Sequence, residues 1–240
     1  MRAIILAAGR GSRLPNHLSR NPKCFLKLRK KSLIDYQIES FNKMGISHLS
    51  IITGYKKNLF KKFKLKTFFN KNWKKTNMVY SLLKADKWLS KYDCLVSYGD
   101  IFYAGNKINQ LIHSKKPITL LYDPNWKKLW KKRFKDPLKD AETFKIKKNY
   151  QIFEIGKKTN KYSNIQGQYM GVIKFRPKGW IYFKKILYEK FDKKSKNMYL
   201  TDVFQKIIES NKVLIYGVKY NSKWMEIDNF NDFKILKKNF

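Results

Sequence analysis

The sequence is poor in the residues that would place it in several common protein classes. It has two cysteines, Cys24 and Cys94, in 240 residues, and neither their spacing nor their context suits a zinc site or a disulfide framework. No apolar run is long enough to span a membrane, and no charged region followed by an apolar one marks a secretory leader. We therefore expect a cytoplasmic protein with free thiols and no membrane span.

Arginine is also scarce, although the chain carries a formal net charge of +37. Only seven of its 54 basic residues are arginine, and the lysines are spread along the whole length rather than gathered in one tail. Nucleic-acid surfaces use arginine heavily for forked contacts with bases and phosphates. The abundant residue types have A/T-rich codons, so a low-GC genome explains the composition. We expect no specific nucleic-acid partner, although the charge attracts small anions.

What the sequence does contain is a strand that runs directly into a glycine-rich loop. Residues 3–6 read as a buried strand, and residues 7–12 follow with two glycines. Small residues let consecutive N–H groups point into one hollow, which suits the phosphates of a nucleotide. Arg10 and Arg13 add positive charge with forked donors. The loop lacks the third glycine of a dinucleotide fingerprint and the spacing of a P-loop, so a plain strand-to-helix turn stays open at this point.

Strands and helices alternate through much of the chain, which indicates an α/β fold with a Rossmann-like, doubly wound, mostly parallel mixed sheet. The whole of 1–240 reads as one domain. We expect residues 1–123 and 213–240 to form its nucleotide-binding part, and residues 124–212 to form a small inserted subdomain that shapes the pocket for a second substrate, the acceptor. The predicted strands are 3–6, 48–53, 68–70, 94–98, 118–122, 143–146, 151–155, 169–175, 213–218 and 224–227, and the predicted helices are 33–44 (capped by Ser32), 55–63, 78–89, 179–191, 202–210 (capped by Thr201) and 230–240.

Acidic residues stand where two of the predicted strands end. Asp100 follows the buried strand 94–98, and ligands of doubly wound sheets bind at the carboxyl ends of strands. Glu226 and Asp228 fall on the same face of the predicted strand 224–227. Mg²⁺ prefers one or two carboxylates together with substrate phosphate oxygens. We expect Asp100 and Asp228 to bind one or two Mg²⁺ ions, with a capping role or a solvated acidic edge as the alternative.

The opening loop and a later lysine segment together resemble the signature of an enzyme family. The string LAAGRGSRL at residues 6–14 is followed by residues 21–28, which contain a Pro-Lys pair with Lys23. This order and spacing are similar to the nucleotidyltransferases that make nucleoside-diphosphate-activated small molecules. The resemblance implies the nucleotidyltransferase fold, with the nucleotide on the loop and on Lys23.

Three further strings narrow the resemblance to one branch of that family. Residues 76–82, 99–100 and 224–228 look like the cytidylyltransferases that act on phosphocholine, 2-aminoethylphosphonate and related phosphonates. The resemblance covers nearly the whole chain and implies CTP as the donor and Mg²⁺ on Asp100 and Asp228. It implies the following nucleotide-binding residues: Leu6, Ala7, Ala8, Gly9, Gly11, Ser12, Arg13, Lys23, Thr76, Asn77, Ser81 and Asp100.

The reaction expected from these parts needs no general base. An oxygen of the acceptor's phosphate or phosphonate is already ionised at neutral pH, and none of the three histidines stands in an evident triad. Positioning and electrostatics then carry the transfer of CMP and the release of pyrophosphate. We expect Lys23, Arg13, Asp100 and Asp228 to be the catalytic residues.

The head of the acceptor is the part that the sequence leaves open. Sugar-nucleotide enzymes of the family carry a Glu-Lys-Pro element, and the comparable stretch here has Gly156 and Lys157, which argues against an ordinary sugar phosphate. A choline or aminoethyl head would need an aromatic wall or a carboxylate, and an acidic head would need Arg133 or a lysine. Both sets are present, and plain core packing explains the aromatic residues equally well. The expected acceptor-binding residues are Lys157, Gln168, Tyr169, Trp126, Arg133 and Glu226.

Three other functions are compatible with parts of the sequence. A sugar-1-phosphate nucleotidyltransferase is less compatible with the sequence, because the stretch at Gly156 lacks the Glu and Pro of the Glu-Lys-Pro element. A basic nucleic-acid-binding protein gives no reason for Asp100 and Asp228 to follow strands beside a phosphate loop. A nucleotide-binding regulator without turnover would not need Lys23 and both acids. The expected partners are CTP and a small anionic acceptor, and a homodimer is also considered.

Overall fold

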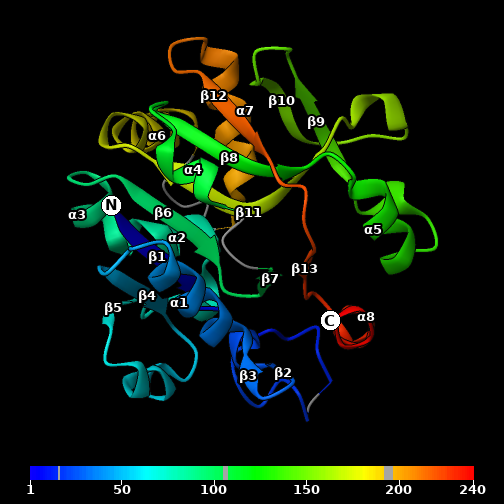
Figure 1. Cartoon of the computed structure of the whole chain (residues 1–240). Helices are drawn as coiled ribbons and strands as arrows, with labels where there is room; N and C mark the ends of the chain where they lie inside the picture. Colours follow the sequence, from blue (N-terminus) through cyan, green and yellow to red (C-terminus); the bar gives the residue numbers. More distant parts are fainter. Residues whose placement is uncertain (16, 105–107, 192–196) are drawn as a thin grey trace.

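One large sheet organises the fold, which the computed structural model describes for residues 1–15, 17–104, 108–191 and 197–240. The strands are β1 (Arg2–Ala7), β2 (Lys27–Leu28), β3 (Lys31–Ser32), β4 (Leu49–Thr53), β5 (Lys66–Phe69), β6 (Cys94–Tyr98), β7 (Ile101–Tyr103), β8 (Ile118–Asp123), β9 (Glu142–Ile146), β10 (Gln151–Lys158), β11 (Gln168–Phe175), β12 (Ile215–Lys219) and β13 (Trp224–Glu226). Nine of them form the sheet in the order β5-β4-β1-β6-β11-β8-β12-β10-β9 (Figure 1). β1 is parallel to β4 and β6, whereas β11 and β10 run antiparallel to their neighbours. The sheet is therefore mixed and mostly parallel, as predicted.

Helices cover both faces of this sheet. They are α1 (Leu33–Lys43), α2 (Met78–Leu82), α3 (Asp86–Leu89), α4 (Asn109–His113), α5 (Trp126–Arg133), α6 (Pro177–Lys190), α7 (Leu200–Ser210) and α8 (Phe230–Asn239). Side chains of β1 alternate between the two faces, so that Ile4 packs with residues of α2, α3, α6 and α7 while Ile5 packs with residues of α1, α4 and α5. This two-sided burial confirms the doubly wound interpretation.

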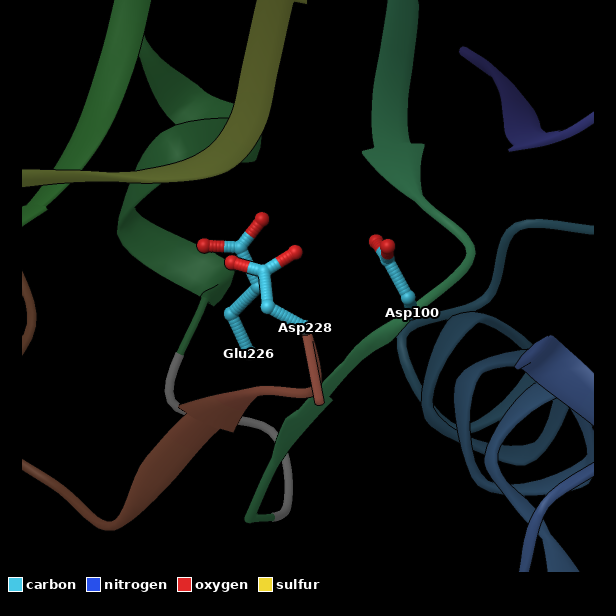
Figure 2. A group of neighbouring side chains, drawn as sticks. All are labelled: Asp100, Glu226 and Asp228. Atoms are coloured by element: carbon cyan, nitrogen blue, oxygen red, sulfur yellow. The ribbon is translucent and has the colours of Figure 1, made fainter. Parts of the chain in front are cut away.

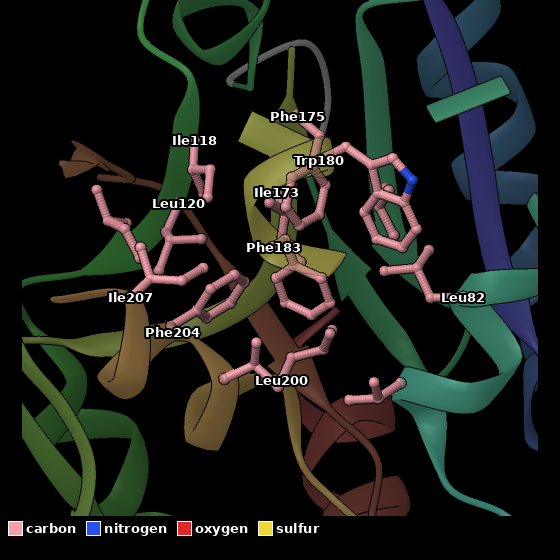
Figure 3. Close-up of a cluster of buried hydrophobic side chains, with 14 of the residues drawn as sticks. Leu82, Ile118, Leu120, Ile173, Phe175, Trp180, Phe183, Leu200, Phe204 and Ile207 are labelled. Carbon is pink, nitrogen blue, oxygen red and sulfur yellow. The ribbon is translucent and has the colours of Figure 1, made fainter. Parts of the chain in front are cut away.

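The segment 124–212 is joined to the rest of the fold through an aromatic cluster. β11 lies between β6 and β8, so a strand of this segment is central in the sheet. Trp180 and Phe183 of α6 stack at 5.2 Å between ring centroids, and each meets Phe175 of β11 at 5.5 Å (Figure 3). Such rings bury large apolar areas and dominate the energetics of a core. These rings lie in one core with Ile4 of β1 and Leu82 of α2, so the segment 124–212 shares a core with the N-terminal part of the chain.

Several predicted element boundaries were wrong for identifiable reasons. The predicted helix 78–89 is divided by a 3₁₀ turn at Leu83–Ala85, and the predicted helix 55–63 is a 3₁₀ helix at Lys57–Phe63. Thr201 is not an N-cap, because Asp202 accepts a hydrogen bond from the N–H of Tyr199 at 2.8 Å and the helix begins at Leu200. The short strand β7 and the helix α5 were not predicted.

The cysteines and the helices agree with the expectations from composition. Cys24 and Cys94 are both free and buried, and burial raises the pKa of both thiols. In the described part of the chain, none of the helices combines the length and apolarity needed to traverse a bilayer.

Candidate active site

The glycine-rich loop forms one wall of a cavity at the carboxyl end of β1. Gly11 has a φ of +79°, a region that glycine enters without strain, and a Cβ there would overlap Cγ of Lys23. The loop and Lys23 line a cavity of about 370 Å³, which Gly99 and Asp100 close from the end of β6. Because β1 and β6 are parallel neighbours, with Leu6 paired to Tyr98, the loop and Asp100 meet at the same edge of the sheet.

All predicted nucleotide-binding residues line this cavity or the one beside it. The second cavity, of about 200 Å³, is bounded by the start of α2, where Asn77 caps the helix through a hydrogen bond from the N–H of Met78 at 2.7 Å. Arg13 and Asp100 belong to both linings, so the two cavities adjoin. The first cavity is lined by Leu6, Ala7, Gly9, Gly11, Ser12, Arg13, Lys23, Asn77 and Asp100, and the second by Leu6, Ala8, Gly9, Arg13, Thr76, Asn77, Ser81 and Asp100.

Three carboxylates converge where these cavities meet. Asp100 comes from the turn after β6, and Glu226 and Asp228 come from the other side of the site (Figure 2). β13 pairs with β7, and the N–H of Ile227 donates to the carbonyl of Asp100 at 3.0 Å, which holds the two segments together. One oxygen of each carboxylate lies within 4.8 Å of the others. β13 ends at Glu226, so Asp228 lies in the turn before α8 and not on the strand where it was predicted. Carboxylate oxygens at this spacing suit a hard divalent cation.

Lys23 stands between two of these acids. Its ammonium lies 3.2 Å from Asp100 and 3.2 Å from Asp228, and its side chain is only 10% exposed. Burial alone would lower the pKa of Lys23, but the two carboxylates outweigh it and raise that pKa. Arg13 adds a further bond to Asp228 at 2.5 Å, although its own side chain is exposed. The site therefore presents fixed positive and negative charges side by side, as a metal-bound triphosphate would require.

The three acids are not electrostatically equivalent. Burial, together with the charges of Asp228 and Asp100, raises the pKa of Glu226 to about 8, and the charges of Arg133 and Lys23 oppose this rise. Burial acts in the same sense on Asp228, but Lys23, Arg13 and Arg133 together hold its pKa below the ordinary value. Asp228 is thus kept ionised by close ion pairs, whereas Glu226 forms none with the described residues, and the charges of Arg133 and Lys23 only partly offset its burial.

Arg133 contacts Asp228 but lines none of the cavities around the three acids. Its side chain is fully buried and forms a two-pronged ion pair with the equally buried Asp232, at 3.0 and 3.2 Å. It also donates to the second oxygen of Asp228 at 3.3 Å. Asp232 in turn accepts the N–H of Asp228 at 2.9 Å. Arg133 was predicted to bind the acceptor, but in the structure it holds two carboxylates of the protein. The sequence around Arg133 could not reveal this, because its partner Asp232 lies 99 positions away.

A third cavity, of about 380 Å³, extends from the acids toward β9, β10 and α7. Of the residues predicted to bind an acceptor, Glu226, Gln168 and Tyr169 line this cavity. Trp126 does not, because its ring is buried and its indole N–H donates to the carbonyl of Ile165 at 3.2 Å. Trp126 therefore belongs to the core.

Lys157 also lies outside that lining, and Lys158 takes its place. The pairing of β10 with β9 shifts register between Ile155 and Lys158, and Gly156 has a φ of +83° within this irregularity. The resemblance points to Lys157 through the stretch comparable to Glu-Lys-Pro, but a β-bulge interrupts the alternation of side chains along a strand, and here Lys158 lines the cavity instead. Glu142, one of the carboxylates that the sequence offers to a cationic head, lines the cavity from β9, and Thr201, which sequence reasoning did not place there, lines it from α7.

Substituting alanine for Gly11 is expected to lower turnover by on the order of 100-fold, because the new Cβ displaces Lys23 from the acids. Gly45→Ala is the matched control. Gly45 also has a positive φ, +73°, but a Cβ added to it at the end of α1 would meet nothing within 4 Å. Both variants should lose about 1 kcal/mol of stability from backbone strain in urea denaturation. Equal activity of the two variants would contradict the role given to Gly11.

Comparisons with known proteins agree with this arrangement. A family model described as the MobA-like NTP transferase domain matches residues 3–125. A CTP:phosphoglutamine cytidylyltransferase from Campylobacter jejuni is 37% identical over 254 aligned residues, which cover 98% of both chains. A choline-phosphate cytidylyltransferase from Streptococcus pneumoniae is 41% identical over 86 residues, 34% of this chain and 38% of that protein. The solved structure of a CTP:phosphocholine cytidylyltransferase from S. pneumoniae shares the fold, with a TM-score of 0.74 over 99% of this chain and 98% of that one at 23% identity.

Proposed function

The chain belongs to the family of the MobA-like NTP transferase domain and is a nucleotidyltransferase, and we propose that it transfers CMP from CTP to a small phosphate or phosphonate acceptor. The observation that supports this most strongly is the position of the acids. Glu226 and Asp228 line both the nucleotide-side cavity and the acceptor-side cavity. The α-phosphate of CTP and the phosphate of the acceptor would therefore meet at the carboxylates.

The relatives supply the nature of the two substrates. The Campylobacter and pneumococcal proteins are both named as cytidylyltransferases, and their names give phosphoglutamine and choline phosphate as acceptors. Both acceptors are small phosphorylated molecules, and we propose one of the same kind here. Asn77 and Ser81 at the start of α2 would face the cytosine side of the nucleotide, while the loop with Gly11 would bind its phosphates.

The proposed step is a single displacement at the α-phosphorus. An ionised oxygen of the acceptor forms the new P–O bond, the bond to the β-phosphate breaks, and its electron pair leaves with pyrophosphate. Lys23 and Arg13 would neutralise charge that builds on the phosphates. Asp100 and Asp228 would hold Mg²⁺, which supplies charge neutralisation and alignment of the triphosphate when it is bound. The acceptor oxygen is already ionised, so no side chain has to remove a proton.

Two alternatives make different predictions. A sugar-1-phosphate nucleotidyltransferase would use a hexose 1-phosphate, but the bulge at Gly156 replaces the Glu-Lys-Pro element of those enzymes. A nucleic-acid-binding protein would bind DNA without Mg²⁺ and with a steep salt dependence. The nucleic-acid alternative does not account for two cavities that share the acids beside a phosphate loop, and the stretch at Gly156 separates the sugar-phosphate alternative from the proposal.

The test is an acceptor panel assayed with all four nucleoside triphosphates and Mg²⁺, with pyrophosphate release as the readout. We expect release with CTP and at least one of phosphocholine, 2-aminoethylphosphonate and phosphoglutamine. Turnover of a hexose 1-phosphate alone, or with another nucleotide in preference to CTP, would refute the proposal.

A further inference from the structure

The far end of the acceptor-side cavity carries two opposite charges. Glu142 of β9 and Lys158 of β10 are direct partners in the antiparallel register. Residues opposite one another in such a pair project from the same face of the sheet, and both line the cavity. The near end carries Glu226, Asp228 and Arg13, where the acceptor phosphate is proposed to react. The head of a bound acceptor would therefore point toward Glu142 and Lys158.

Glu142 and Lys158 face each other across the two strands, and Lys158 lowers the pKa of Glu142, but the two charges are too far apart to form a close ion pair. On the same two strands Lys145 and Glu154 form an ion pair at 3.3 Å, whereas across the described residues neither Glu142 nor Lys158 has an ion-pair partner. Glu142 is partly buried, and leaving a buried charge without a partner costs free energy. A cationic group of a ligand would restore that interaction.

The other acids near this end are already engaged. Asp140 accepts the indole N–H of Trp130 at 2.9 Å. Asp202 caps its own helix by accepting the N–H of Tyr199. The carboxylate of Asp202 therefore already occupies the positive end of the α7 dipole, and an anionic group of a ligand would be repelled there. The ammonium of Lys158 is the group left to bind such an anion at this end of the cavity. Glu142 and Lys158 are therefore the side chains left to read charge on the head.

The fold brings these groups together through Gly156. A Cβ at Gly156 would approach Cβ of Thr201 to 2.7 Å, so the glycine allows the bulge of β10 to lie against the start of α7. Thr201 also lines the cavity, and its hydroxyl acts to lower the pKa of Glu142. The stretch around Gly156, which stands where sugar-nucleotide enzymes carry Glu-Lys-Pro, thus shapes the end of the cavity where the head of the acceptor would lie.

We infer that the acceptor has a head with both a cationic and an anionic group, as an α-amino acid has, and that Glu142 binds the cation and Lys158 the anion. This inference rests on the proposed function. A quaternary ammonium head would be attracted by Glu142 and by the aromatic side chains, but it would be repelled by Lys158 and would leave that ammonium unpaired. A purely anionic head would leave Glu142 unpaired. A head with both charges satisfies both residues.

The test compares three acceptors that differ only in the charges of the head. They are O-phosphohomoserine, its decarboxylated analogue 3-aminopropyl phosphate, and its deaminated analogue 4-phosphonooxybutanoate, each with CTP, Mg²⁺ and pyrophosphate detection. We expect kcat/KM for the amino-acid head to exceed that of either analogue by about 10-fold or more. Glu142→Gln should penalise the two acceptors with an amine, and Lys158→Met the two with a carboxylate. Lys157→Met and Glu154→Gln are the controls, because neither residue lines the cavity.

The possible outcomes distinguish a wrong acceptor head from a wrong enzymatic activity. A preference for 3-aminopropyl phosphate or phosphocholine over the amino-acid head, or equal losses for all three acceptors in the two variants, would overturn the inference and leave the proposed function standing. The absence of turnover with CTP and any acceptor in the presence of Mg²⁺ would refute the proposed function, and the inference with it.

A stability measurement tests the unpaired state of Glu142 without any substrate. Burial raises the pKa of Glu142 to about 7, the charges of Asp202 and Asp140 act in the same direction, and Lys158 and the hydroxyl of Thr201 oppose them. Because the folded protein then holds a proton that the unfolded chain releases, wild-type stability falls as pH rises from the ordinary carboxyl range to about 7. Glu142→Gln does not titrate, so its urea midpoint should exceed that of the wild type at about pH 8 and not at about pH 4. A wild type as stable as the variant at about pH 8 would show that Glu142 has an internal partner, which would overturn the inference.

Discussion

Replacing Asp100 or Asp228 with asparagine is expected to lower turnover by on the order of 1000-fold while the protein stays folded. Each carboxylate contributes one of the oxygens that converge within 4.8 Å. Asparagine keeps the shape but removes the charge that a divalent cation and the triphosphate require. Lys23, Arg13 and Arg133 together stabilise the ionised form of Asp228, so Asp228→Asn should also lower the melting temperature.

Asp136→Asn is a suitable control for these variants, because Asp136 is an acid that caps a short turn and lies outside the three cavities. Binding of Mn²⁺, followed by electron paramagnetic resonance, gives a readout that is independent of turnover. We expect weaker binding in both site variants and unchanged binding in the control. Near-normal rates with Asp100→Asn or Asp228→Asn would remove that residue from the proposed cation site.

Lys23→Met should also lower turnover by on the order of 1000-fold, but it should destabilise the protein as well. Its ammonium lies 3.2 Å from both Asp100 and Asp228, and its loss leaves two partly buried carboxylates without this partner. Breaking a buried ion pair by removing one member typically costs about 3 kcal/mol. Added Mg²⁺ should recover part of the stability through the carboxylates, without restoring activity.

Lys27→Met provides the comparison, since Lys27 is exposed on β2 and lines none of the three cavities. Urea denaturation with and without Mg²⁺, together with a turnover assay, measures both effects. If Lys23→Met were as stable and active as Lys27→Met, the bridge between the acids would be irrelevant to function.

The nucleotide side of the site could be predicted from sequence because its determinants are local. A strand, a loop of small residues and a strand-end acid each have a recognisable pattern, and parallel strands place their carboxyl ends at one edge. The loop with Gly11 and the turn at Asp100 therefore meet as expected. The start of α2 at Asn77 also lies where the resemblance implied.

The acceptor side depends on contacts that a linear pattern does not contain. The bulge at Gly156 exchanges Lys157 for Lys158, and strand periodicity gives no sign of it. The pairing of β13 with β7 brings Glu226 and Asp228 to Asp100, although the two segments are far apart in the sequence. Long-range packing of this kind decides which of several acids and cations face a cavity.

The role of Arg133, which forms a buried pair with Asp232, also could not be predicted from the sequence. An arginine near aromatic residues is typical of an anion-binding pocket, and the sequence alone favours that role for Arg133. In the structure its side chain is completely buried and fixes Asp228. Only the fold shows that this positive charge is used to hold a carboxylate and not a substrate.

The most direct test of the account follows oxygen atoms through the reaction. O-Phosphohomoserine with heavy oxygen in its phosphate group would be incubated with unlabelled CTP, Mg²⁺ and the enzyme, and the products would be analysed by mass spectrometry. The account predicts a CMP–acceptor product that keeps all of the label, including the bridging oxygen, and pyrophosphate that carries none. Free CMP with unchanged acceptor, or CDP with a doubly phosphorylated acceptor, would contradict attack of the acceptor on the α-phosphate.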